Sequence, residues 1–221
     1  MILHKDGINN FLWDTLMRFQ NDPFFKNYHL AGGTAFSLQI GHRISEDIDL
    51  FTKDDLQKEH ILQFAQNIHK NVEVRNEGNT IYQLYFPHQQ LKVDFVHYPH
   101  KLLDPVIETD EGLHMIGIND IAAMKMSAAG TRGYEAKDFV DLFFILKKMQ
   151  IDTIIENFIK KYESENPLHY IRSMAYFDDV SPASWQAIKM IHEPLSVNDI
   201  KNTLINEVRD YERRMLNNVR D

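Results

Sequence analysis

Apolar residues recur along the chain with two different periods, and these periods predict helices and strands. Spacings of three and four residues predict an opening helix over 9–20 and a further helix over 54–70. A short helix is expected over 34–40. Alternation of apolar with polar residues predicts strands at 28–31, 47–51, 71–75, 80–86, 91–97 and 106–109. Because short turns join the three strands between 71 and 97, we expect an antiparallel meander attached to the earlier strands.

Beyond residue 112 the two-residue period disappears and only helical spacing remains. It predicts helices over 121–128, 137–148, 152–162 and about 196–220. We therefore expect two domains, an α/β core over 1–112 and a helical domain over 113–221. The predicted fold class is α+β, with a mixed, largely antiparallel sheet flanked by helices and followed by a helical C-terminal region.

Composition narrows the class of protein. The chain has 221 residues, 43% of them hydrophobic, a formal net charge of −8 and no cysteine. The lack of cysteine excludes disulfide scaffolds and thiolate chemistry. Neither a secretory leader nor an apolar run long enough to span a bilayer is evident, so we expect a cytoplasmic protein without a membrane partner. Because an acidic chain repels a polyanion, binding of nucleic acid would need a local basic patch or metal ions.

The first chemical motif is Gly32-Gly33-Thr34, which lies between a predicted strand and a predicted helix. Glycine lets the backbone turn sharply there, and the free N–H groups of a helix start attract an anion. With the Thr34 hydroxyl as a further donor, the motif indicates a phosphate site. Taken alone it also fits a plain turn.

The second motif is a set of carboxylates on predicted strands. Asp47 and Asp49 are two residues apart and therefore leave one face of their strand, and Asp94 can join them if its strand lies alongside. Carboxylates held together repel each other unless a cation compensates, and Mg²⁺ or Mn²⁺ is the usual choice. Three carboxylates also suit metal-assisted phosphoryl transfer. By themselves, Asp47 and Asp49 also fit a solvated strand end. Alternation puts Lys92 on the same strand face as Asp94, so these two residues also fit a surface pair.

These motifs, in this order, resemble one known family. The segment from Leu30 to Phe51, the stretch Lys92-Val-Asp-Phe and the segment from Met124 to Leu142 are similar to the AbiEii/AbiGii toxin family, within the polymerase-β-like nucleotidyltransferase superfamily. The resemblance covers roughly residues 30–146. One departure is Thr34, where the superfamily commonly has serine.

The resemblance implies a polymerase-β-like fold and a Mg²⁺-dependent transfer of a nucleoside monophosphate from an NTP. It places Gly33 and Thr34 on the triphosphate and Asp47 and Asp49 on the metal, with Asp94 as the third carboxylate. Family members are typically toxins of toxin–antitoxin or phage-defence pairs, so it also implies an antitoxin partner and an RNA acceptor such as the tRNA 3′ end.

Several cations complete the candidate site. Lys125 on a predicted helix, Arg132 in a glycine-flanked loop and Lys137 before the next helix can neutralise a polyphosphate. Lys125, between two methionines, is expected to project toward the ligand, which makes it a candidate catalytic residue. Asp138 and Asp141, three residues apart on one face of the next predicted helix, can orient these cations or bind a second ligand. Arg43 can reach a phosphate or pair with the neighbouring acids.

Two alternatives concern what the site does. The net charge of −8 fits a cationic small-molecule acceptor, such as an aminoglycoside, at least as well as RNA, and a protein side chain is a further candidate. A nucleotide-binding module that has lost activity is the non-enzymatic alternative. In the tail, Tyr170, Tyr176, Phe177 and Trp185 can stack on bases or form core.

Overall fold

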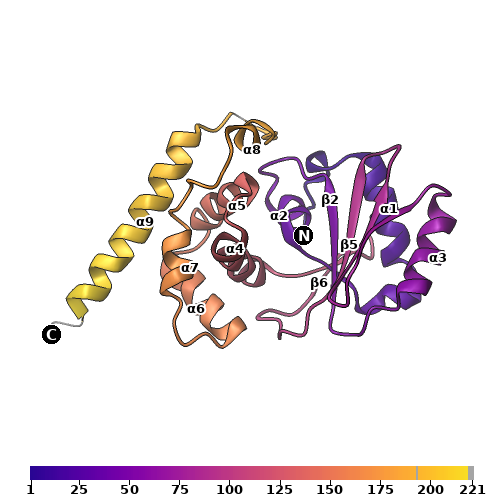
Figure 1. Cartoon of the computed structure of the whole chain (residues 1–221), viewed down its shortest axis with the longest axis horizontal. Helices are drawn as coiled ribbons and strands as arrows, with labels where there is room; N and C mark the ends of the chain where they lie inside the picture. The colour runs from indigo at the N-terminus through magenta and orange to yellow at the C-terminus, as the bar shows by residue number, and fades with distance from the viewer. Residues whose placement is uncertain (193, 219–221) are drawn as a thin grey trace. The chain divides into compact units, whose positions relative to one another are not determined.

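A computed structural model describes residues 1–192 and 194–218, which form two compact units (Figure 1). The first unit spans Met1–Gly117 and the second spans Ile118–Asp221. No helix in the described part of the chain is long and apolar enough to cross a membrane.

The first unit is built on a seven-stranded sheet with the order β3-β4-β5-β2-β1-β7-β6. Its strands are β1 (His29–Leu30), β2 (Asp47–Thr52), β3 (Glu73–Glu77), β4 (Ile81–Phe86), β5 (Leu91–His97), β6 (Ile107–Glu108) and β7 (His114–Met115). β3, β4 and β5 pair antiparallel in sequence, as the predicted meander requires. β5 then joins β2 in parallel, and β1 pairs antiparallel with β2 and parallel with β7. The mixed, largely antiparallel sheet confirms the predicted α+β class.

Two helices and a short 3-10 turn cover one face of this sheet. They are α1 (Asn10–Gln20), α3 (Lys58–Ile68) and η2 (Pro23–Asn27). The side chain of Asn9 caps α1 by accepting a hydrogen bond from the backbone N–H of Leu12 at 2.8 Å. Phe19 of α1, Phe25 of η2 and Phe95 of β5 meet edge-on or tilted, with ring centroids 5.0–5.9 Å apart. Because Phe95 faces this aromatic core, the neighbouring residue Asp94 leaves the opposite face of the sheet.

A third helix, α2 (Gly32–Ile40), begins two residues after β1 ends. It starts at Gly32, which takes a φ of +65°, and it ends at Gly41 with a φ of +64°. Both values lie in the left-handed region that favours glycine. The N-terminal turn η1 (Lys5–Gly7) packs against this helix. In the link from α2 to β2, the backbone N–H of Ser45 donates to the carbonyl of Gly7 in η1 at 2.8 Å.

The second unit consists of helices. They are α4 (Ile118–Arg132), α5 (Ala136–Leu146), α6 (Ile151–Tyr162), α7 (Leu168–Ser173), α8 (Pro182–Gln186) and α9 (Val197–Asn218). α4 packs against α5, α6 and α7, and α9 packs against α5 and α6. Phe139, Phe177 and Trp185 form an aromatic cluster in this unit, with Phe139 and Phe177 buried. At least these two rings serve as core.

The structure differs from the sequence prediction mainly at short elements and at helix ends. β7, α7 and α8 were not predicted. The two helices have six and five residues, less than two turns, so an apolar face cannot repeat along them. α3 begins at Lys58 rather than at residue 54, since Thr52 Oγ1 accepts a hydrogen bond from the Asp54 N–H and forms a turn. α4 extends beyond the predicted 121–128 at both ends. Residues 219 and 220 of the predicted last helix lie outside the described residues.

Candidate active site

The register between β2 and β5 brings the candidate carboxylates to one place. In this parallel pair Asp49 lies opposite Asp94, and Asp47 lies opposite Lys92. Side chains of directly paired residues leave the same face of a sheet. All four groups therefore share the face that α1 and α3 leave uncovered.

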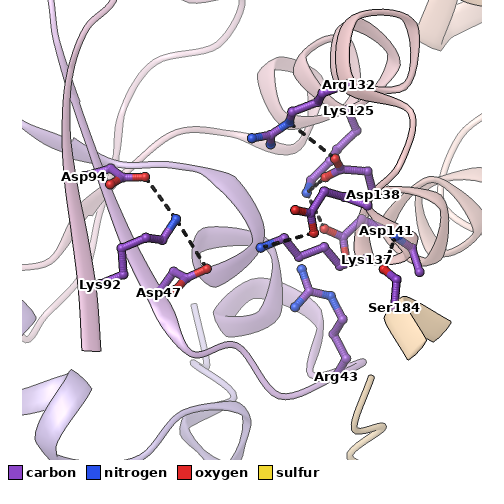
Figure 2. Close-up of polar contacts among 12 residues, drawn as sticks. Arg43, Asp47, Lys92, Asp94, Lys125, Arg132, Lys137, Asp138, Asp141 and Ser184 are labelled. Carbon is purple, nitrogen blue, oxygen red and sulfur yellow. Dashed lines mark hydrogen bonds and ion pairs between the residues drawn. The ribbon is translucent and has the colours of Figure 1, made fainter. Parts of the chain in front are cut away.

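Lys92 lies between these carboxylates, as Figure 2 shows. Its Nζ is 3.0 Å from Oδ2 of Asp94 and 3.6 Å from Oδ2 of Asp47. The other oxygen of Asp94, Oδ1, accepts a hydrogen bond from Nε2 of Gln83 on β4 at 2.8 Å. Both oxygens of Asp94 are thus held, and its side chain is only 14% exposed. The sequence predicts a metal ion that compensates the negative charge of these carboxylates. In this structure the Lys92 ammonium provides that positive charge.

The charges around Lys92 fix its protonation state. Burial by itself would lower the pKa of the ammonium. The carboxylates, with Asp49 contributing most and Asp47 and Asp94 adding to it, outweigh burial and raise the pKa of Lys92 above its usual range. Lys92 is therefore a permanent positive charge at this site at any physiological pH.

The start of α2 lies directly against Asp49. A Cβ atom added to Gly32 would overlap Oδ2 of Asp49 and come within 3.1 Å of its Cγ. The backbone N–H of Ala31, the residue before the helix, donates to the backbone carbonyl of Asp49 at 2.8 Å. Because Ala31 provides no side-chain cap, the first N–H groups of α2 have no partner from the capping residue. A carboxylate and a helix start able to bind an anion are thus in contact.

The contacts of Thr34 differ from the sequence prediction, and those of Arg43 favour one of its two predicted roles. Thr34 is fully buried, and its Oγ1 contacts Oγ of Ser45 at 2.8 Å and the backbone carbonyl of Asp47. Its hydroxyl fixes the chain leading into β2 instead of facing a phosphate. Arg43 is only 4% exposed, packs against the backbone of Gly33 and donates from Nη1 to the carbonyl of Ile44 at 3.1 Å. Of the two roles left open for Arg43, its burial favours the structural one.

Lys125 lies in the second unit, on α4. It is 5% exposed, and its Nζ lies 2.6 Å from Oδ1 of Asp138 and 2.6 Å from Oδ2 of Asp141 (Figure 2). The ion pair forms because Asp138 and Asp141, three residues apart on α5, present one acidic face to α4. The structure thus places Lys125 in a buried ion pair with these two carboxylates, and its role toward a ligand stays a prediction.

The other two predicted cations lie at the edge of this buried cluster. Arg132 Nε is 3.6 Å from Oδ2 of Asp138, and the arginine side chain is 54% exposed. Lys137 Nζ lies 3.9 Å from Oε2 of Glu135, and its side chain is 36% exposed. Both remain accessible to a ligand.

The predicted site residues are divided between the two units. The first unit contains the three carboxylates together with Gly32, Gly33, Thr34 and Arg43.

The residues of the first unit suit a divalent metal by their chemistry. Within the described residues, no three His, Asp or Glu side chains already converge as a metal cluster. The donor set is nevertheless made of carboxylate oxygens alone, which are the ligands that Mg²⁺ and Mn²⁺ prefer. The Lys92 ammonium is a stand-in cation among them. The position therefore already stabilises positive charge.

Sequence reasoning passed over Lys92 and Gln83 as site residues. Lys92 had been placed on the same strand face as Asp94, and that placement was the available signal. Gln83 carried no signal, because its contact with Asp94 depends on the register of β4 and β5.

Comparison with known proteins gives concordant matches. A family described as "Nucleotidyl transferase AbiEii toxin, Type IV TA system" matches residues 14–210. The uncharacterized protein aq_aa25 of Aquifex aeolicus (strain VF5) is 31% identical over 170 residues, which are 74% of this chain and 80% of that protein. The fold is similar to the crystal structure of an H. pylori protein described as a nucleotidyltransferase, with a TM-score of 0.56, 14% identity and 93% of each chain covered. JHP933 from Helicobacter pylori matches with a TM-score of 0.50, 15% identity and 95% of each chain covered.

Proposed function

Since the chain belongs to the AbiEii nucleotidyltransferase toxin family, we propose that it transfers a nucleoside monophosphate from an NTP to RNA, with a divalent metal held at Asp47, Asp49 and Asp94. The observation that carries this proposal is the contact between Asp49 and Gly32. It joins the carboxylate set to the start of α2. A triphosphate bound at that helix start would then lie beside the metal ligands.

The residues of the first unit have different roles in the proposed reaction. The backbone of Gly32 and Gly33 opens the helix start to the phosphates, where N–H groups and the helix dipole favour negative charge. Thr34 and Arg43 hold this turn and the start of β2 in position through their buried contacts. Asp49 and Asp94, opposite each other in the register, orient the reacting groups on the uncovered face.

Asp47, Asp49 and Asp94 would hold the metal, which is Mg²⁺ or Mn²⁺. When bound, such an ion lowers the pKa of an attacking hydroxyl and holds the phosphates of the leaving pyrophosphate. The hydrogen bond from Gln83 to Asp94 keeps that carboxylate in a single orientation for this purpose. Asp94 Oδ2, which accepts a hydrogen bond from Lys92, is the candidate acceptor of the hydroxyl proton.

The acceptor we propose is the 3′ end of a tRNA, and the biological role is that of the toxin in a type IV toxin–antitoxin pair. The family description supports the toxin role. Exposed Arg132 and Lys137 are the candidate contacts to the phosphates of NTP or RNA, since their side chains remain accessible beside the buried Lys125 cluster.

The test is transfer of label from each of the four NTPs, in turn, to total bacterial RNA in the presence of Mg²⁺. The Asp49→Asn variant is compared with Asp55→Asn, an exposed carboxylate beyond the end of β2 that undergoes the same change of charge. We expect tRNA-sized RNA to be labelled by one NTP, with label lost in Asp49→Asn and kept in Asp55→Asn. Full activity of Asp49→Asn would refute the assignment of the carboxylates.

A second candidate acceptor follows from the net charge of −8. A cationic small molecule is attracted by an acidic chain, whereas RNA is repelled at long range. Transfer to RNA should therefore fall steeply between low and physiological salt, while turnover of a small acceptor should change less. Measurable binding of Mg²⁺–NTP without any labelled RNA would favour this second candidate or a protein side chain.

A further inference from the structure

Resting on the proposed function, we infer that Lys92 is a resident counter-ion which a divalent metal must displace, so that it suppresses metal binding until the nucleotide arrives. Lys92 is then a positioning residue of the metal site. It holds the carboxylates together in the metal-free protein without supplying a ligand itself. The inference concerns only groups within the first unit.

The geometry that supports this inference is the placement of Lys92 inside the carboxylate set. Nζ contacts Asp94 at 3.0 Å and Asp47 at 3.6 Å, from opposite sides in Figure 2. Lys92 and Asp47 are paired across β2 and β5, and Asp94 is two residues further along the same strand as Lys92. The ammonium therefore occupies the space between oxygens that a shared metal would need.

The charges make displacement necessary. A divalent ion among these carboxylates would lie close to a fixed ammonium, and two like charges a few ångströms apart repel strongly even when half exposed. The Lys92 side chain is 31% exposed and its four-carbon stem is flexible, so the ammonium can move out toward solvent. The contacts of Lys92 Nζ with Asp94 and Asp47 must therefore break before a metal ion can bind to these carboxylates.

An incoming triphosphate changes this balance. The displaced ammonium needs another anion, and a triphosphate at the start of α2 brings several negative charges to the same face, beside Asp49. With the phosphates present, Lys92 can pair with them instead of competing for the carboxylates. The structure thus links metal affinity to nucleotide binding through one side chain.

The experiment measures Mn²⁺ affinity of the full chain by calorimetry, with and without a non-hydrolysable NTP. The variants are Lys92→Met and Lys92→Gln, the second of which keeps a hydrogen-bond donor but removes the charge. Lys26→Met, an exposed lysine on η2, is the matched control for net charge, and Asp49→Asn tests whether the Mn²⁺ lies at this site. Thermal unfolding of each variant with and without Mn²⁺ provides a readout besides affinity.

Without nucleotide, we expect both Lys92 variants to bind Mn²⁺ about tenfold more tightly than the wild type, because one repelling charge is removed. Lys26→Met should bind like the wild type. The Lys92 variants should also gain more in melting temperature from Mn²⁺, since metal replaces the missing counter-ion. With the NTP analogue, their advantage should shrink or reverse.

Unchanged or weaker Mn²⁺ binding by both Lys92 variants, with binding still lost in Asp49→Asn, would overturn the inference and leave the proposed metal site intact. If the Lys92 variants still bind Mn²⁺ about tenfold more tightly than the wild type when the NTP analogue is present, the link between metal affinity and nucleotide binding is refuted. If, with the NTP analogue present, wild type and Asp49→Asn bind Mn²⁺ equally or not at all, the proposed metal site fails and the inference fails with it.

Discussion

Substitution of Gly32 by alanine should separate the catalytic role of the α2 start from its role in the fold. Gly32 has a φ of +65°, a conformation that costs an alanine about 1–2 kcal/mol. The added Cβ would overlap Oδ2 of Asp49, and this carboxylate can rotate away at modest cost because it is the end of a side chain. Rotation, however, moves a proposed metal ligand. We expect a modest loss of stability together with a large loss of function.

Gly41 provides the matched control at the other end of the same helix. It has a φ of +64°, so Gly41→Ala carries the same backbone strain, but its new Cβ would meet Nδ1 of His4 at 2.6 Å instead of Asp49. Both variants should lower the melting temperature by roughly 2–8 °C, since about 1 kcal/mol shifts a chain of this size by about 2–4 °C. Only Gly32→Ala should lose Mg²⁺–NTP binding in calorimetry and nucleotidyl transfer. Equal losses of binding in the two variants, or normal binding by Gly32→Ala, would refute the reasoning.

Three further predictions concern buried or half-buried polar groups. Lys125→Met leaves two buried carboxylates without their shared cation and should lower the free energy of unfolding by about 3–5 kcal/mol in a urea titration; a loss below about 1 kcal/mol would contradict this. Thr34→Val removes a buried hydroxyl and should cost about 1–3 kcal/mol in the same assay, whereas Thr34→Ser should retain most of the stability. Partial burial of the imidazole lowers the pKa of His29, and the nearby His114 lowers it further. The unfolded chain therefore binds a proton at this residue more readily than the native protein does. Stability should therefore fall as the pH drops below about 6.5, and less steeply in His29→Gln, as melting temperatures between pH 8 and pH 5 will show.

Alternation along single strands was enough to predict which carboxylates share a face. Asp47 and Asp49 both leave one side of β2 because side chains repeat every two residues. From the sequence, Asp94 could be placed beside Asp49 only on the condition that their two strands are neighbours. It depends on β5 inserting next to β2 in parallel, after β3 and β4 have formed, and no local pattern specifies such a long-range pairing.

Thr34 shows a different reason for failure. The glycines correctly marked the turn into a helix, but the helix begins at Gly32 rather than at residue 34. That shift of two residues makes Thr34 the third residue of the helix, where its hydroxyl points to Ser45 and the start of β2. Two residues correspond to about 200° of helical rotation, enough to turn a side chain from the ligand side to the buried side, and a shift of one or two residues is the usual uncertainty of a helix end.

A charged residue within an apolar helix face is stable only when it pairs with an opposite charge. The second unit shows where such opposite charges lie in the sequence. Lys125 lies between two methionines on α4, and burying an unpaired ammonium there would be strongly unfavourable. The sequence already held two aspartates at a spacing of three on the following predicted helix, and helices joined by a short turn pack against each other. Lys161 and Asp120, both fully buried and paired at 2.6 Å between α6 and α4, follow the same rule over a separation of 41 residues. A lysine in an apolar stretch should therefore first be assigned to an acidic pair on a neighbouring helix, and to a ligand only when no such pair exists.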